Sequence, residues 1–484
     1  MSNFIFGANW FLPGNTPYPG QLNVDEKDGK IILEIYSSKT IEGYQNSVTQ
    51  NPAEYFHQYI FGDGFGGPFT LYNCHLAGAN SIGKDFYKST YKIEFLIYGV
   101  QVNPSAELMV KSGKFLFPGL ADWYDGWHHT QVLSNIEGKL TDLYLSKSEK
   151  LKISDDLELI FYDTVNSRIE QISFSYLISY NKSVTFNYSD DVPFSRLLQD
   201  SVTFLKLLEF SNSKPLNRMI AGLEISHTHV TNKPAYHRAE NLTKYYRISN
   251  FSLSKNKEIP KHGSVAVHMV FNHDKLGSKE ELNKLIIKWF SQQTFNNIIE
   301  YYLDANNWFQ GSKGALLSNV MFNNRFLNLI QGLEDYYREK HYNNNDEVQF
   351  NLNKAAAMKR IIDPVLKHWL NDTFKFSVHL SLAEKLKIIV AECMPDLIAI
   401  YGSVSFDNFP RAAADFRNTL SHGMNKEINL GDKLHLHYQI ARFLLLICIL
   451  KSLGIKDIKR LLDHHFSLGR NMQQIIRLQK IYPA

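Results

Sequence analysis

The pattern of apolar and polar positions divides the chain into two parts. In the first part, short runs of β-branched and aromatic residues alternate with turn residues, which is typical of antiparallel strands in a sandwich or barrel. Asp28-Gly29 and Ser112-Gly113 are predicted as such turns, and one helix is predicted near residues 194–210. The predicted strands include residues 31–35, 91–97, 157–161, 171–175 and 263–271.

The pattern changes to a helical period near Ser278. Ser278 and Glu281 have the spacing of a capping box, in which an N-cap hydroxyl and a Glu three positions later satisfy free backbone N–H groups. Helices are then predicted at about residues 315–340, 351–370, 382–400, 407–420, 434–453 and 455–466. We therefore predict an α+β multidomain protein. Its parts are a β-rich region (1–277), a helical connector (278–313) and an all-α bundle (314–484).

Composition excludes several classes of protein. The formal net charge is only +4, so the chain is not a uniformly basic nucleic-acid coat and any RNA contact must be local. Its three Cys are far apart, without a CxxC, which argues against a disulfide framework or a zinc knuckle. The N-terminus does not resemble a signal peptide, and the longest apolar run, residues 443–450, is too short to span a bilayer. We expect a cytoplasmic protein without membrane partner, metal or cofactor.

A glycine-rich loop over residues 62–67 matches the G-x-G-x-x-G pattern of dinucleotide-binding sites. That fingerprint requires a helix directly after the loop, because the helix N-terminus holds the pyrophosphate. Residues 68–72, PFTLY, follow instead and are predicted as a strand. A tight β connection is therefore the better interpretation of this loop.

The strongest candidate for chemistry is the run 417–422, RNTLSH. Arg417 and His422 are five positions apart, roughly 140° around an ideal helix, so they would not converge on a straight helix. Gly423 follows and is a preferred residue just beyond a helix C-terminus, which predicts that the helix ends there. A frayed last turn could then bring His422 towards Arg417. A helix C-terminus also favours the protonated imidazole.

These residue types suit cleavage of RNA without a metal. The 2′-OH of the substrate can attack the adjacent phosphorus while His422 moves protons. Arg417 supplies a planar cation for the phosphoryl oxygens, and Asn418 can hold the imidazole tautomer or a phosphate oxygen. The expected products are a 2′,3′-cyclic phosphate and a 5′-OH end. Basic residues near a helix C-terminus also hydrogen-bond the last carbonyls, so spacing alone leaves a purely structural role open.

Weaker candidates lie elsewhere in the helical part. His435 and His437 are predicted on one helix near Arg442, where they could line an RNA site. Glu334 could orient a catalytic group, although a structural ion pair is the simpler interpretation. No residue among these four is needed for the chemistry outlined above.

The motif in its helical setting resembles the HEPN superfamily, whose ribonucleases carry an R-x4–6-H motif, usually with a polar residue after the Arg, as Asn418 is here. Residues 326–338, FLNLIQGLEDYYR, resemble the first bundle helix of ApeA-type HEPN proteins, which are bacterial antiphage defence proteins. Gly332 and Tyr337 depart from the Ala and His common in that helix. Segments that resemble the ApeA N-terminal domain follow in order at 10–13, 19–20, 70–74 and 117–123.

The resemblance implies an endoribonuclease that arrests or kills the infected cell. It implies a homodimer in which two motifs face each other across one composite active site, so that a monomer is inactive. A phage-derived trigger is expected, and the partner is RNA, with transfer RNA as one candidate.

Two alternatives stay open. Some HEPN domains bind nucleotides or RNA without cleaving them, and the basic stretch from residue 451 onward would then matter more than His422. Alternatively, the β-rich region senses a phage component or a polysaccharide, and the helical bundle serves only for dimerisation.

Overall fold

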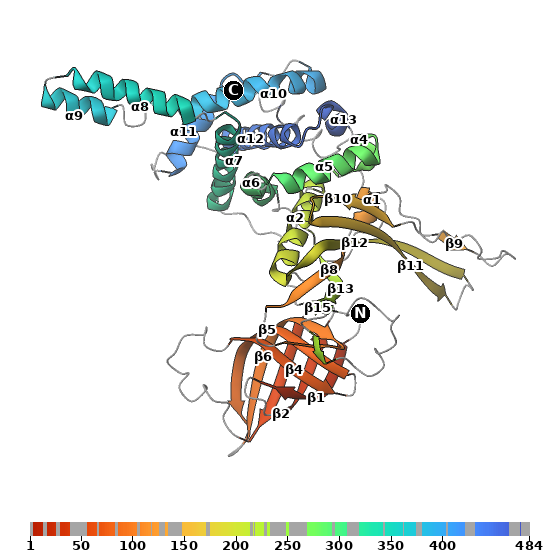
Figure 1. The fold of residues 1–484 in the computed structure, drawn as a ribbon. Helices are drawn as coiled ribbons and strands as arrows, with labels where there is room; N and C mark the ends of the chain where they lie inside the picture. The colour runs from red at the N-terminus through yellow and green to blue at the C-terminus, as the bar shows by residue number, and fades with distance from the viewer. Residues whose placement is uncertain are drawn as a thin grey trace. The chain divides into compact units, whose positions relative to one another are not determined.

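The computed structural model folds as two compact units (Figure 1). The first comprises Met1–Leu208 and Leu216–Val265, and the second comprises Glu209–Pro215 and Ala266–Ala484. The structure describes residues 3–12, 17–25, 30–38, 56–64, 67–82, 86–103, 107–117, 119–124, 131–133, 148–170, 175–212, 216, 218–226, 230–232, 248–250, 269–292, 296–306, 319–341, 344–361, 363–373, 380–402, 405–421, 431–463 and 475.

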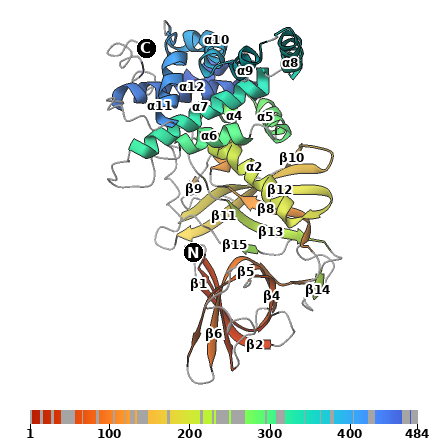
Figure 2. The ribbon, with the colours of Figure 1, turned by 90° about the vertical axis from the view of Figure 1, so that its left-hand side faces the viewer.

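Seven strands of the first unit form one antiparallel sheet, six of which close into a barrel (Figure 2). The strand order is β15-β6-β3-β2-β1-β4-β5, and β5 also pairs with β6, which closes the ring. These strands are β1 (Asn3–Phe11), β2 (Pro17–Asp25), β3 (Lys30–Ser37), β4 (Phe56–Gly64), β5 (Gly67–Ser81), β6 (Tyr87–Tyr98) and β15 (Ile248–Asn250). The predicted β-rich, barrel-like fold is confirmed.

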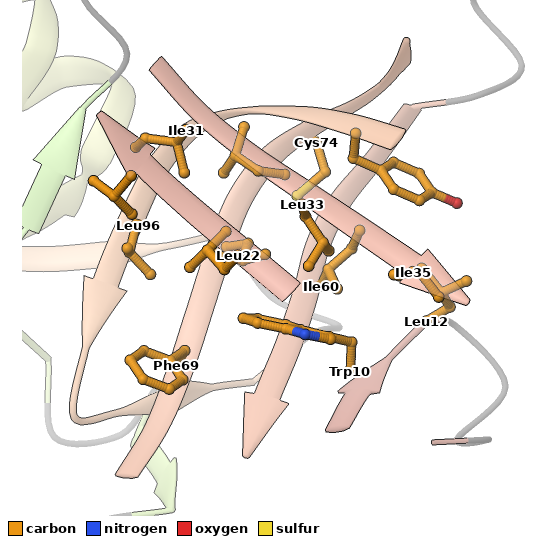
Figure 3. Packing of buried hydrophobic residues seen from close by; sticks show 14 residues of the cluster. Trp10, Leu12, Leu22, Ile31, Leu33, Ile35, Ile60, Phe69, Cys74 and Leu96 are labelled. Atoms are coloured by element: carbon orange, nitrogen blue, oxygen red, sulfur yellow. The ribbon is translucent and has the colours of Figure 1, made fainter. Parts of the chain in front are cut away.

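Alternate residues of the strands fill the barrel interior (Figure 3). On β3, Ile31, Leu33 and Ile35 are buried, as expected from the period of two in a strand. Trp10 of β1 lies among them, and its ring occupies the space beside Gly62. A Cβ atom at Gly62 would come within 2.4 Å of that ring, so glycine is required there by the close approach.

The glycine-rich loop is a hairpin connection between β4 and β5. Gly64 and Gly67 face each other at the ends of the two strands, and a strand follows the loop. The predicted tight β connection is confirmed. Without a helix after it, this loop lacks the N-terminal dipole and free N–H groups that hold a pyrophosphate.

A second antiparallel sheet in the same unit has the order β10-β11-β12-β8-β13, with β9 paired to β12. Ser112 and Gly113 lie inside β8, so the turn predicted there is wrong. Gly113 instead allows α2 (Phe194–Asn212) to pack closely, because a Cβ at this position would lie 2.4 Å from Leu197. The strands are β8 (Met109–Leu116), β9 (Gln131–Leu133), β10 (Glu149–Lys152), β11 (Leu157–Glu170), β12 (Ser175–Pro193) and β13 (Met219–Ile225).

The helix predicted over 194–210 is confirmed as α2, and three of the predicted strands lie in β3, β6 and β11. The predicted strands over 171–175 and 263–271 fall largely outside the described residues, as does the turn at 28–29. The remaining short elements of the first unit are α1 (Leu120–Tyr124), β7 (Gln101–Val102) and β14 (Val230–Asn232).

In its described residues the second unit is helical from α4 onward; the short helix α4 lies before residue 278, the predicted start of the helical part. The helices predicted over 315–340, 382–400, 407–420 and 434–453 are confirmed as α7, α10, α11 and α12. Its helices are α4 (His273–Leu276), α5 (Lys279–Ser291), α6 (Asn296–Asn306), α7 (Asn319–His341), α8 (Asn344–Lys359), α9 (Pro364–Thr373), α10 (Leu382–Tyr401), α11 (Phe409–Ser421), α12 (Gly431–Ser452) and α13 (Ile458–Asp463). The predicted boundaries at 277/278 and 313/314 remain predictions.

The helix predicted over 351–370 is two helices, α8 and α9. Pro364 lacks an N–H group and its ring clashes with the carbonyl four residues earlier, so a helix cannot run through it without a kink. Asp363 instead starts α9, because its carboxylate accepts the N–H groups of Val365 (2.8 Å) and Leu366 (3.3 Å).

Ser residues begin two of the helices. The Ser278 hydroxyl accepts the Glu281 N–H at 3.2 Å, but the Glu281 carboxylate pairs with Lys284 at 2.6 Å. Only the N-cap half of the predicted capping box is therefore observed at α5. A complete capping box starts α10, where Ser381 and Glu384 each bind the backbone of the other.

Helix α12 is the core of the bundle and contacts α6, α7, α10, α11 and α13. Residues 433–452 have a mean hydropathy of 1.3, and among the described residues they form the one helix long and apolar enough to cross a membrane. In this structure 83% of that segment is buried. A helix that is apolar on all faces is expected at the centre of a bundle, so this segment is explained by its packing.

Candidate active site

Helix α11 carries the first five residues of the candidate motif. Phe409 and Ala413 are buried on its inner face. Phe416 lies on the same face, since its ring is 6.3 Å from that of Phe326 on α7 and 5.1 Å from that of His437 on α12. The spacing of four and three residues forms one apolar stripe, which sets the rotation of α11 against the bundle.

The rotation of α11 determines where the motif residues point. Arg417 directly follows Phe416 and is half-buried, whereas Asn418 is exposed. Thr419 donates from Oγ1 to the carbonyl of Asp415 at 2.9 Å, a bond within the helix itself. Within the part of the chain that the structure describes, no carboxylate forms a salt bridge with Arg417.

The helix ends at Ser421, and His422 lies outside the described residues. The structure therefore places Arg417 and Asn418 on adjoining faces of one helix and gives no distance from either to His422. The end of the helix within two residues of Gly423 agrees with the expected C-terminus. The convergence of Arg417 and His422 remains a prediction.

His437 is a core residue and does not line an RNA site. Its side chain is 6% exposed, and its ring lies 5.8 Å from Phe409 and 5.1 Å from Phe416. Burial, and secondarily the charge of Lys433, lowers the pKa of His437 from 6.5 to about 4. The ring is therefore neutral at pH 7, and the suggestion that it lines an RNA site is replaced by a packing role. His435 is half-buried, with its ring 5.9 Å from Phe322.

Glu334 on α7 forms an ion pair with Lys385 on α10, with 2.6 Å between Oε1 and Nζ. The side chains are only 18% and 16% exposed, so the pair ties two helices together in a partly dry environment. The structural ion pair expected for Glu334 is observed. Among the described residues, no group of three His, Cys, Asp or Glu side chains is arranged to hold a metal ion.

Two comparisons with known families cover most of the chain. The family described as ApeA N-terminal domain 1 matches residues 6–289, and the family described as Apea-like HEPN matches residues 327–458. No curated protein and no solved structure matches the chain. The HEPN match spans α7 to the start of α13 and includes the whole run 417–422; a HEPN domain suggests a ribonuclease in defence. The chain belongs to the ApeA family, with an ApeA N-terminal domain followed by an Apea-like HEPN domain.

Proposed function

We propose that the protein is a metal-independent endoribonuclease that acts in antiphage defence by abortive infection. The observation that carries the proposal is the run 417–422 at the end of α11, inside the residues matched by the HEPN family. Arg417 is half-buried beside Phe416, whose ring packs on that of His437, and this packing limits the directions open to the guanidinium. A cation held in one direction suits the charge that develops on phosphoryl oxygens.

The reaction is an internal transfer at phosphorus. The 2′-oxygen of the RNA forms a bond to the adjacent phosphorus, and the bond from phosphorus to the 5′-oxygen breaks. The proton of the 2′-OH goes to a base, and the leaving 5′-oxygen receives a proton from an acid. The products are a 2′,3′-cyclic phosphate and a 5′-OH end. In this proposal His422 moves the protons, Arg417 binds the phosphoryl oxygens and Asn418 supports either group.

Two imidazoles serve this reaction better than one. The base that takes the 2′-OH proton needs a ring nitrogen with a free lone pair, and the acid that protonates the 5′-oxygen needs a ring nitrogen that carries a proton. One ring nitrogen cannot be in both states at once. A homodimer with a composite active site would supply His422 as base and His422 of the partner subunit as acid. A monomeric form is then inactive with both residues intact.

The test is cleavage of RNA by the purified protein in the presence of EDTA. We expect His422→Ala to slow cleavage about a hundredfold or more, the usual contribution of general acid–base catalysis, and Arg417→Ala to slow it by a similar factor. His368→Ala, on the exposed surface of α9, is the matched control and should cut at the wild-type rate. The assignment is wrong if His422→Ala cuts as fast as wild type, or if EDTA abolishes cleavage.

The substrate and the cellular setting need a separate experiment. We propose RNA in the cytoplasm as the substrate, with transfer RNA as one candidate, and a phage-derived trigger. Sequencing RNA ends from cells that express wild type or His422→Ala identifies the substrate and its cut positions. Ends that carry 2′,3′-cyclic phosphate and are absent with His422→Ala support the proposal. If the wild-type protein binds RNA but cuts none, the binding-only alternative is favoured.

A further inference from the structure

Two of the three cysteines meet in the core of the helical bundle. Sγ of Cys393 on α10 lies 3.7 Å from Sγ of Cys448 on α12, and both side chains are fully buried. At this distance the two sulfur atoms are in contact. The residues are 55 positions apart in the chain, so only the packing of α10 on α12 brings them together. Both are free thiols in this structure.

An ion pair about one helical turn away holds the two helices together at this place. Asp396 and Lys451 each follow a cysteine of the pair by three positions, and Nζ of Lys451 lies 2.6 Å from Oδ2 of Asp396. The same Nζ donates to the backbone carbonyl of Glu392 at 2.5 Å. The thiols are therefore in contact where other interactions already hold α10 close to α12.

This placement suits the formation of a disulfide. An S–S bond is about 2.0 Å long, so the two sulfur atoms need to approach each other by about 1.7 Å. Rotation about the Cα–Cβ bonds, together with a small shift of the helices, covers an approach of this size. Cysteines whose side chains start far apart need a large movement of the backbone instead.

Burial makes the reaction of this pair slow without closing it off from solvent. Burial, and secondarily the hydrogen bond with Cys393, raises the pKa of Cys448, and the thiolate is the reactive form. Glu392 directly precedes Cys393, and its side chain is 25% exposed. The buried pair therefore lies one residue from a side chain that reaches water. Hydrogen peroxide is uncharged and little larger than water, so a local opening of the helices admits it.

We propose that Cys393 and Cys448 form a reversible disulfide on exposure to hydrogen peroxide, and that this bond clamps α10 to α12. One sulfur attacks a peroxide oxygen, the O–O bond breaks, and the hydroxide that leaves takes up the thiol proton to become water. The second sulfur then attacks the resulting sulfenic acid, the S–O bond breaks, and a second water leaves with the second thiol proton. The two sulfur atoms lose two electrons in all, and the peroxide is reduced to two molecules of water.

The disulfide closes a loop that contains the whole of α11. Residues 394–447 lie between the two cysteines, and they include the run 417–422. Closing this loop reduces the conformational freedom of the unfolded chain, which stabilises the folded bundle. The bond forms away from the packing of α11, because Phe416 contacts His437, roughly 16 Å along α12 from Cys448. The clamp therefore strengthens the bundle around the motif, and it does not depend on the proposed ribonuclease function.

The test treats the reduced full chain with hydrogen peroxide and maps disulfides by mass spectrometry after proteolysis. We expect peptides joined through Cys393 and Cys448, and an intact mass that is lower by two hydrogen atoms. The melting temperature of the bundle should rise by about 5 °C or more, as expected from the entropy of a loop of this length. Dithiothreitol should reverse both changes. This comparison uses the wild-type chain alone, so it does not depend on the folding of a variant.

Cys448→Ala and Cys74→Ala are matched variants, because each removes one buried thiol and Cys74 lies in the core of the barrel. Peroxide should raise the melting temperature of Cys74→Ala as in wild type and leave that of Cys448→Ala unchanged. The site is overturned if peroxide leaves both cysteines as thiols, or converts them to sulfinic or sulfonic acids without a cross-link. A cross-link between two chains, visible as a dimer on a non-reducing gel, would also overturn it. A bond within one chain that leaves the melting temperature unchanged would overturn the clamp.

Discussion

The burial of His437 makes the stability of the bundle depend on pH. The pKa of this ring falls from 6.5 to about 4 on folding, so the unfolded chain binds the proton more readily than the folded chain. The contribution of the neutral His437 ring to the free energy of unfolding is fully present above about pH 6.5. It is lost as the pH falls from about 6.5 to about 4. At about 1.4 kcal/mol per pH unit the full loss is about 3 kcal/mol, and about 2 kcal/mol of it should be lost between pH 7 and pH 5.

The assay compares urea unfolding of wild type and His437→Phe at pH 7 and pH 5, followed by circular dichroism. Phenylalanine does not titrate and can pack between Phe409 and Phe416, whose rings already lie against this position. Other groups titrate equally in both proteins and cancel in the difference. Wild type should therefore lose about 2 kcal/mol more than His437→Phe over this pH range. Equal losses in the two proteins would refute the neutral, buried state of His437.

Two further predictions concern the packing of α7. Glu334→Gln leaves Lys385 without its partner, which should cost about 1–2 kcal/mol of unfolding free energy, between the values for exposed and buried pairs. RNA cleavage per folded molecule should not change, and a selective loss of cleavage would indicate a catalytic role. Gly332→Ala places a Cβ 2.9 Å from Leu445, a fully buried side chain; the strain of about 1–3 kcal/mol outweighs the gain in helix propensity of about 1 kcal/mol. The variant should melt at a lower temperature than wild type, and a higher one would contradict the argument.

The strands and most helices could be predicted from local pattern. The alternation of Ile31, Leu33 and Ile35 identifies a strand and its buried face, and the strand after Gly67 excludes a dinucleotide loop. Closure of the barrel could not be predicted, because the pairing of β5 with β6 depends on twist and register and not on any one segment. The error at Gly113 has the same origin, since only the tertiary approach of Leu197 distinguishes a glycine in a strand from one in a turn.

The candidate site was predictable in part. The run 417–422 and the end of its helix could be recognised from spacing, residue type and resemblance. The burial of His437 also had a signal, because the surrounding segment is largely apolar, and such a helix is expected to be mostly buried in a bundle. The contact of Phe326 on α7 with Phe416 on α11 had none, because it depends on how the two helices pack. The Cys393 and Cys448 thiols, 3.7 Å apart, are brought together in the same way by α10 and α12.

The orientation of α11 connects the fold with the proposed chemistry. Phe409, Ala413 and Phe416 face the core, so packing sets the rotation of the helix about its axis. Successive residues are about 100° apart, which places Arg417 on the flank and Asn418 in solvent once Phe416 is in the core. A shift by one residue would bury the guanidinium, and the desolvation of an unpaired cation opposes that strongly. Phe416 therefore holds Arg417 at the boundary of core and solvent, where the cation keeps its charge and its direction is restricted by the packing beside it.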